Sequence, residues 1–418
     1  MINILKHNPK ILKSINTVEY ALLIAIIFVL PYWGLLKYFK HFVSILFILT
    51  LVSGQLDLKN LLKEKVVIVL FSFIIFTYLS ALWTEGPLEI TRELHLNFDR
   101  FKYYFLLIPA VYSLSLGKKQ IQNLFFLMAL APFITVIIYY CNGFGITHIY
   151  SQLFFHGNTN FITHYLINNP FIVYSALYFY ILIFESFKQH NFKKAFLYTC
   201  ITAVLFVSLF IDSGSTSRLM LVVFFLLAMI IPFFYLNKRN LFLVLFITLG
   251  ISLFFISTNS KMQKGIQTFK TAESQGVYSG SWGHRLGFAI VGLKIFEENP
   301  WFGRGIIDVR EKTIQYAKEH PKYFIGDHNR HFHDEHINIL VEVGIVGYLI
   351  FIIFIILFLR LHINNTFINN LKISVILFYL LLMFGEHYLT IKQATYFFAL
   401  FIGLMLSYHK TIDTHADL

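Results

Sequence analysis

The chain has 418 residues, of which 57% are hydrophobic, 18% aromatic and 13% charged. Soluble domains carry about 25% charged residues, so this composition excludes a soluble enzyme, a DNA-binding protein and a disordered chain. The net charge of +12 is then typical of basic cytoplasmic loops and of surfaces that hold phosphates or anionic lipids. Cys141 and Cys200 lie in or beside apolar runs without metal-binding spacing, and we interpret them as small residues within the bilayer.

A membrane-spanning helix needs about 20 apolar residues, and about twelve runs approach or exceed this length. They cover 18–36, 41–56, 66–84, 103–117, 121–141, 165–186, 195–212, 218–236, 241–257, 339–360, 372–391 and 393–408. The even number of runs and the excess of Lys and Arg in the loops on the N-terminal side predict that both termini are cytoplasmic. We therefore predict an all-α polytopic membrane protein with about 12 transmembrane helices.

A polar stretch of about 80 residues, 258–338, separates the ninth run from the tenth, and parity assigns it to the outer face. Loops of this length usually have a function or their own fold. The spacing of apolar residues predicts a helix over 282–296, which Asn299 and Pro300 end. The chain then divides into a membrane domain, 1–257, a long outer loop, 258–338, and a second membrane part, 339–418.

Two arginines at the outer face are candidate anion ligands. Arg218 follows the polar turn 212–217 and begins an apolar run. A guanidinium, hydroxyl groups and a helix N-terminus together favour phosphate, although an arginine that extends to lipid headgroups is the alternative. Arg285 begins the predicted loop helix in Gly283-His284-Arg285-Leu286-Gly287, and its alternative is a solvated helix face.

A histidine-rich segment directly precedes the tenth run. We expect the helix to begin near residue 333, so that His333 and His336 share one face at the membrane surface. The segment fits a solvated polar patch, a metal site of His331, His333, His336 and a carboxylate, or a general base. The third is favoured, because no strong zinc spacing is present and imidazole accepts a proton at neutral pH. Asp334 or Glu335 would then fix its tautomer.

Motifs for other donors are absent from the sequence. It contains no Asp-x-Asp pair for a nucleotide sugar, no Walker lysine loop and no Gly-x-Ser-x-Gly elbow. Outward arginines and an outward histidine instead favour a donor that carries its leaving group in the bilayer, such as a lipid pyrophosphate.

The segment from His333 to Gly347 resembles the signature of the O-antigen ligase and polymerase superfamily. In that signature a Gly follows the histidine by eleven residues and a second Gly lies three further on, as Gly344 and Gly347 do here. Ser215-Thr216-Ser217-Arg218 resembles the family's turn ending in Arg. The stretch from Gly283 to Gly305 resembles its Arg, apolar helix, Pro and glycine turn. The family prefers Asn, Ser or Gln where this chain has Asp334.

This resemblance implies an O-antigen ligase, a glycosyltransferase of the bacterial inner membrane with its active site on the periplasmic face. It would transfer a glycan from undecaprenyl diphosphate to the lipid A core with inversion, and it would use no metal or other cofactor. His333 would be the base, and Arg218 and Arg285 would hold the donor pyrophosphate. Further candidates at the same face are His336, Glu335, Arg330 and Glu386.

Two other functions stay open. An O-antigen polymerase or a protein O-oligosaccharyltransferase would use the same donor with a different acceptor. A transporter of lipid-linked glycans or anions is the alternative from another class, and it would require charged residues within the spans. The carboxylates within the runs are few and lie mostly near the ends, which favours the enzyme.

Overall fold

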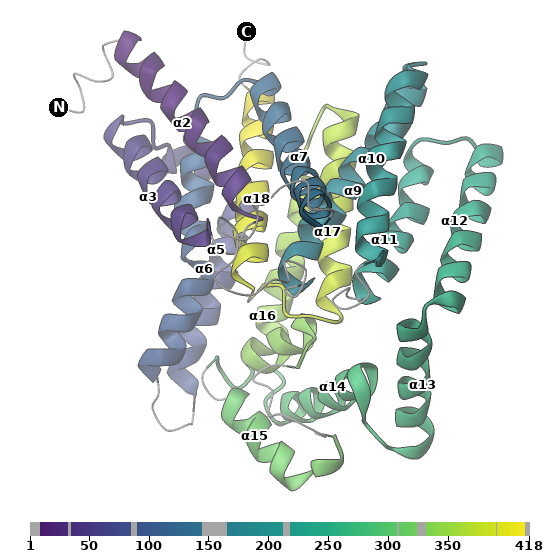
Figure 1. Cartoon of the computed structure of the whole chain (residues 1–418). Helices are drawn as coiled ribbons and strands as arrows, with labels where there is room; N and C mark the ends of the chain where they lie inside the picture. Colours follow the sequence, from purple (N-terminus) through teal and green to yellow (C-terminus); the bar gives the residue numbers. More distant parts are fainter. Residues whose placement is uncertain are drawn as a thin grey trace.

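The computed structural model describes residues 9–31, 35–84, 90–143, 165–211, 218–306, 309–323, 332–389 and 391–413. Within these ranges every regular element is a helix and no strand is present (Figure 1). The first half contains α2 (Pro9–Val29), α3 (Leu36–Val52), α4 (Leu58–Leu61), α5 (Lys65–Leu79), η2 (Ser80–Trp83), α6 (Ile90–Ser113), α7 (Lys118–Gly143), α9 (Tyr165–Lys188) and α10 (Phe192–Ile211). The second half contains α11 (Arg218–Ile230), η4 (Ile231–Phe234), α12 (Lys238–Thr258), α13 (Ser260–Gln275), α14 (Gly280–Glu298), α15 (Val309–Glu319), η5 (Pro321–Tyr323), α16 (Glu335–Arg360), α17 (Thr366–Met383) and α18 (Lys392–Asp413).

The helices agree with the predicted class. Each predicted apolar run overlaps one of them, although α2 begins well before residue 18 and α6 well before residue 103. Among the described residues, 8 helices are long and apolar enough to cross a membrane, namely α2, α5, α7, α9, α10, α12, α16 and α17. The other overlapping helices, α3, α6, α11 and α18, are shorter or more polar. The chain is a polytopic membrane protein, while the total of about 12 crossings stays a prediction.

The most deeply buried helix is α18, in which every residue from 393 to 408 is buried. It packs mainly on α6, while α9 packs on α10 and α5 on α16. Aromatic rings fill the centre: Phe39 stacks on Tyr396 at 4.6 Å between ring centroids, and Tyr379 stacks on Phe398 at 4.5 Å. Because lipid is as apolar as these side chains, close packing rather than exclusion of water holds such a bundle together.

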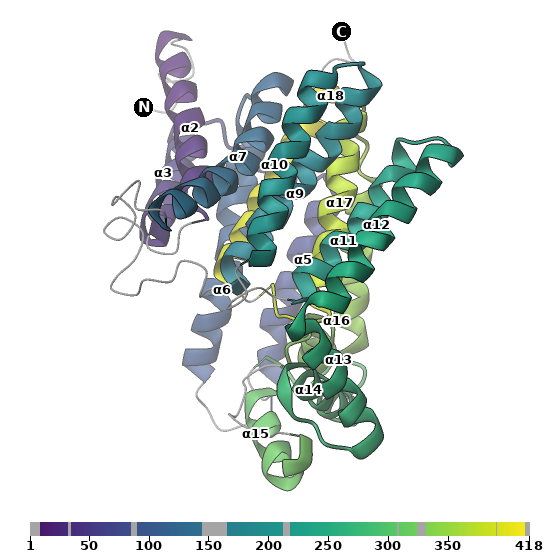
Figure 2. The ribbon, with the colours of Figure 1, turned by 45° about the vertical axis from the view of Figure 1, so that its right-hand side comes forward.

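The ends of the chain and the outer helices lie at opposite ends of the bundle. The start of α2 and the end of α18 are at one end, and α13, α14 and α15 are at the other (Figures 1 and 2). This arrangement is expected for an even number of crossings. Helix α12 stands at the edge, where its side chains face outward; Phe242 is 73% exposed and Phe246 is 68% exposed. We infer that α12 borders lipid.

A second, smaller apolar cluster holds α14 against the start of α16. Its members are Phe288, Val291, Ile295, Tyr323, Phe332, Ile337 and Val341. The close approach depends on Gly292, because a Cβ there would lie 2.3 Å from Ile337 Cγ2 and 3.2 Å from Phe332 Cγ. The helix predicted over 282–296 is thereby confirmed as α14, and it lies directly beside the residues that precede α16.

Helix α16 is broken at Gly344, whose φ is 66° and ψ is −167°. The two carbonyl groups that would accept from the residues after this break are those of Val341 and Glu342. They accept instead from the backbone of the turn that follows α14: Arg304 N donates to Val341 O at 2.8 Å, and Gly305 N donates to Glu342 O at 2.9 Å. The acceptors on the first side of the break are therefore satisfied by another segment.

The same segment, residues 299–305, also accepts from the far side of the break, and we call it the glycine turn. Ile345 N donates to Pro300 O at 2.8 Å, and Val346 N donates to Trp301 O at 3.1 Å. All four backbone groups that the break separates thus find a partner in the glycine turn. An unpaired backbone group in a membrane-spanning helix costs several kcal/mol, so the exchange fixes α14 to α16.

Candidate functional site

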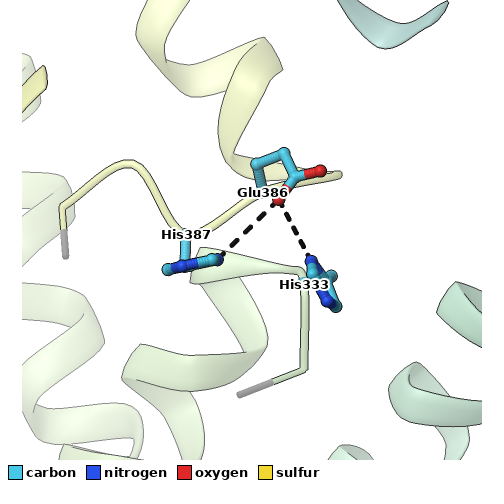
Figure 3. A group of neighbouring side chains, drawn as sticks. All are labelled: His333, Glu386 and His387. Atoms are coloured by element: carbon cyan, nitrogen blue, oxygen red, sulfur yellow. Dashed lines mark hydrogen bonds and ion pairs between the residues drawn. The ribbon is translucent and has the colours of Figure 1, made fainter. Parts of the chain in front are cut away.

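Glu386 lies in the turn between α17 and α18, and its side chain is only 1% exposed. Its Oε1 accepts from an Arg285 terminal nitrogen at 2.6 Å. Its Oε2 is 3.1 Å from His333 Nδ1 and 3.8 Å from His387 Nδ1 (Figure 3). Three basic side chains from separate parts of the chain therefore meet on one buried carboxylate, which supplies the partners that a buried charge requires. We call these four residues the Glu386 cluster.

Arg285, a predicted phosphate ligand, is oriented at two points. Its Nε donates to Gly385 O at 3.1 Å and a terminal nitrogen donates to Glu386 Oε1. These contacts use the planar fork of the guanidinium, which a lysine could not reproduce. The side chain is 26% exposed, so an anion can approach the guanidinium from outside the protein. An oriented guanidinium of this kind is suited to binding an anion.

His333, the predicted base, lies just before α16 in a backbone conformation with φ 50°, which is uncommon for a residue other than glycine. Its Nδ1 faces Glu386 Oε2. Because an ionised carboxylate only accepts, Nδ1 carries the hydrogen and Nε2 is the acceptor nitrogen of the neutral ring. The ring stacks on Phe288 with centroids 5.8 Å apart. Both the tautomer and the plane of this imidazole are thereby fixed.

His336, a lower-ranked candidate, has different surroundings. Its Nε2 is 3.1 Å from Leu380 O and its Nδ1 is 3.1 Å from the Tyr348 hydroxyl. Since a carbonyl only accepts, Nε2 donates to it and Nδ1 accepts from the hydroxyl. Nε2 thus links α16 to α17, Nδ1 links the two parts of α16 on either side of Gly344, and the residue is 8% exposed. The expectation that His333 and His336 share one helix face is wrong, because α16 begins at Glu335 and His333 lies outside it.

The two acidic residues after His333 belong to the start of α16. Asp334 is its N-cap, and Oδ1 accepts from Ile337 N at 3.0 Å. Burial raises the pKa of the Asp334 carboxyl above its usual value. Asp, Asn and Ser are all favoured at an N-cap, which accounts for Asp334 at a position where Asn or Ser was expected. Glu335 is fully buried as the first helical residue. The carboxylate that lies 3.1 Å from His333 Nδ1 is that of Glu386, whereas the carboxylate of Asp334 caps α16.

Arg218 is the first residue of α11, and only its backbone is described. The first turn of α11 nevertheless reaches the Glu386 cluster. A Cβ on Gly385, whose carbonyl accepts from the arginine of α14, would lie 2.6 Å from Leu219 Cδ2. The N-terminal end of α11 therefore lies at the same turn as the cluster. Arg330 and His331, and the polar turn 212–217 that precedes Arg218, lie outside the described residues.

Two histidines at this site received no role from the sequence. His387 follows Glu386, and its ring is edge-on to that of His333 with centroids 5.7 Å apart. His284 precedes Arg285 in α14, and burial together with the nearby His333 lowers the pKa of its imidazole. The sequence could have identified both histidines by their position, because each is the direct neighbour of a predicted candidate.

The structure brings together a different set of possible metal ligands from the set predicted from the sequence. His336 uses both ring nitrogens elsewhere, so it does not join His333 in a ligand set. Among the described residues, the side chains with ligand atoms within 4.8 Å of one another are His333, Glu386 and His387.

The fold and the site define a class: an all-helical, polytopic membrane protein with a basic and acidic cluster at one end of its bundle. Residues 201–352 match the family model described as O-antigen ligase. This segment supports membership of the O-antigen ligase and polymerase superfamily, a family of glycosyltransferase-like enzymes, as its motifs predicted. The match includes Arg218, Arg285 and His333, whereas Glu386 lies beyond it. No curated protein matches the sequence.

Proposed function

We propose that the protein is an O-antigen ligase of the bacterial inner membrane. It transfers a glycan from undecaprenyl diphosphate to a sugar of the lipid A core, at the periplasmic face and without a metal. Both termini lie in the cytoplasm, and the loop 258–338 lies in the periplasm between the membrane parts 1–257 and 339–418.

The contact of one carboxylate with both Arg285 and His333 carries this proposal. Glu386 presents Oε1 to Arg285 at 2.6 Å and Oε2 to His333 at 3.1 Å. A group suited to hold a pyrophosphate and a group suited to accept a proton are therefore fixed on opposite oxygens of one side chain. Glycosyl transfer from a lipid pyrophosphate requires both groups near one anomeric carbon.

The geometry supports the following reaction. His333 Nε2 accepts the proton of the acceptor hydroxyl as its oxygen forms a bond to the anomeric carbon. The bond from that carbon to the pyrophosphate oxygen breaks on the opposite face, which inverts the configuration. Arg285 and Arg218, together with the N-terminal end of α11, stabilise the negative charge that develops on the leaving group. Glu386 stabilises the imidazolium and is a positioning residue.

An apolar pocket of about 610 Å³ between α9, α10, α11 and α12 supports a lipid-linked donor. Phe206, Phe224 and Phe254 are among its lining residues. It lies along α11, the helix that begins at Arg218, so a donor with its pyrophosphate at that end would have apolar surface beside its hydrocarbon chain. A nucleotide-linked donor would gain nothing from such a surface.

The molecule that receives the glycan distinguishes a ligase from a polymerase or a protein O-oligosaccharyltransferase, because all three use the same donor. A host that lacks its own ligase, but makes lipid-linked O-chain and core, would receive this gene or a variant of it, and its lipopolysaccharide would be resolved on a silver-stained gel. We expect wild type to restore the ladder of O-chain bands and His333→Ala to abolish it, with both proteins present in the membrane.

Four results would contradict parts of this assignment. A ladder that survives His333→Ala removes the base assignment. No ladder, with lipid-linked repeats that lengthen, shows a polymerase, and transfer of glycan to protein shows a protein O-oligosaccharyltransferase. Movement of lipid-linked glycan across the membrane without any transfer shows a transporter. His336→Phe is the control for His333→Ala. It should retain the ladder when the variant is present in the membrane at the wild-type level.

A further inference from the structure

We propose that His333, Glu386 and His387 bind a divalent transition-metal ion, for which Zn²⁺ is the best fit, and that this ion inhibits the enzyme. The inhibitory effect rests on the proposed function, because it follows from capture of the proposed base. The binding itself depends only on the three side chains.

The ligand atoms lie close to the separations that zinc requires. Zn²⁺ bonds imidazole nitrogen and carboxylate oxygen at about 2.0–2.2 Å, so two ligands of a tetrahedral ion are roughly 3.3 Å apart. Glu386 Oε2 is 3.1 Å from His333 Nδ1 and 3.8 Å from His387 Nδ1. All three ligand atoms lie within 4.8 Å of one another (Figure 3). Small rotations of the two imidazoles would bring them around one ion.

The ligand types select the kind of ion. Two imidazoles and one carboxylate suit Zn²⁺ and its neighbours Co²⁺ and Ni²⁺, whereas Mg²⁺ and Ca²⁺ prefer oxygen ligands throughout. The side chains of His333 and His387 are 23% and 15% exposed, so an ion can reach them from the outer face. Glu386 is nearly fully buried, and burial strengthens its attraction for a cation.

Arg285 limits the affinity. Its contact is with Oε1, on the other side of the carboxylate from the two imidazoles. The carboxylate therefore keeps Oε2 directed at them, but the guanidinium charge repels a divalent ion. We expect binding weaker than that of a structural zinc site, so that the ion is removed by a chelator.

Binding of the ion would disable the proposed base in two ways. Coordination at His333 Nδ1 displaces the hydrogen donated to Glu386 and releases it to solvent. The ion then withdraws electron density from the ring, so Nε2 becomes a weaker proton acceptor. The same ion occupies the oxygen of Glu386 that would stabilise the imidazolium.

The binding test uses the full chain in detergent, purified without a histidine tag and treated with chelator. Co²⁺ is titrated and its visible absorption is recorded, and Zn²⁺ is then added as competitor. We expect one Co²⁺ per chain and loss of its absorption on addition of Zn²⁺. His387→Ala should weaken binding by about 10-fold or more, since one ligand is removed. His362→Ala, which removes an exposed histidine elsewhere, should titrate as wild type.

The outcomes separate the site from the function. Equal titration of wild type and His387→Ala, in proteins with the same unfolding temperature, overturns the site; His387→Gln repeats the comparison if the alanine variant does not fold. In the transfer assay, Zn²⁺ should slow wild type by about 10-fold or more, because it removes general base catalysis by His333, and a chelator should restore the rate. Undiminished transfer by zinc-loaded wild type overturns the inhibition. Chelated wild type without any transfer contradicts the proposed function, while the Co²⁺ titration still decides the site.

Discussion

The carbonyl of Trp301 occupies the space where a side chain of Gly344 would lie, because an ideal Cβ on Gly344 would be 2.3 Å from that oxygen. The backbone of Gly344 has a positive φ with ψ near 180°, a region that essentially only glycine adopts. The sequence signature at this position is thus explained by two independent requirements, conformation and space. Both arise from the insertion of the glycine turn into α16.

Gly344→Ala should therefore destabilise the protein. The backbone conformation alone costs about 1–3 kcal/mol, and the clash with the glycine turn adds to this. We expect a lower unfolding temperature in detergent and less protein in the membrane. The matched control is Gly250→Ala in α12, where nothing lies within 4 Å of the new Cβ and an alanine should stabilise by about 0.5–1 kcal/mol. Equal unfolding temperatures for the two variants would contradict the proposed role of the glycine turn.

Glu386→Gln should reduce transfer by about 10²-fold or more while the protein still folds. An amide cannot stabilise an imidazolium as a carboxylate does, and its NH₂ group cannot accept from Arg285. Steady-state transfer to purified core acceptor would measure the change as a loss of kcat. Glu297→Gln, an exposed residue of α14, is the matched control and should behave as wild type. Full activity in Glu386→Gln would remove Glu386 from the site.

Arg285→Lys should raise the KM for the lipid-linked donor and also lower kcat, because Arg285 both binds the pyrophosphate and stabilises the charge that develops on it. Lysine keeps the positive charge, but it lacks the planar fork that donates to Gly385 O and Glu386 Oε1 together. We expect the KM to rise by about 10-fold, with transfer measured over a range of donor concentrations. Arg239→Lys, an exposed residue at the start of α12, should have no effect. An unchanged donor KM would contradict the assignment of Arg285 to the pyrophosphate.

Asp334→Asn should preserve transfer, because Glu386 rather than Asp334 contacts His333 and asparagine also serves as an N-cap. Burial raises the folded-state pKa of Asp334, so ionisation of this group opposes folding. Its contribution is most favourable below the ordinary Asp pKa of about 4 and is lost as the pH rises through the folded-state value. The asparagine variant should thus unfold at the same or a higher temperature than wild type at pH 7, with a smaller difference below about pH 4. A large loss of transfer at unchanged stability would show instead that Asp334 takes part in the reaction.

The sequence predicted the helices well because apolar runs in a membrane protein have few other solutions. It also identified residues of the Glu386 cluster, since Arg285, His333 and Glu386 were all candidates. It did not predict their contacts, because Glu386 follows a separate helix and only packing brings it to His333. The start of α16 was misplaced, although Asp334 followed by a long apolar run is a usual N-cap pattern.

Two glycines illustrate what the spacing of residues alone does not reveal. Gly303 and Gly344 lie far apart in sequence, and each needs its glycine because the other segment approaches it. A Cβ on Gly303 would lie 2.6 Å from Glu342 C. A turn after α14 was predicted, but nothing in a pattern of residues indicates that a turn will replace hydrogen bonds inside another helix.

The glycine turn holds two residues of the Glu386 cluster in place but not Glu386 itself. Arg285 on α14 and His333 before α16 belong to elements that the exchanged backbone bonds and the cluster around Phe332 hold together. Glu386 comes from the turn between α17 and α18, which takes no part in that exchange. The distance between the proposed base and the guanidinium is therefore set by the contact of α14 with α16, whereas the contact of each with Glu386 depends on where α17 places its last turn.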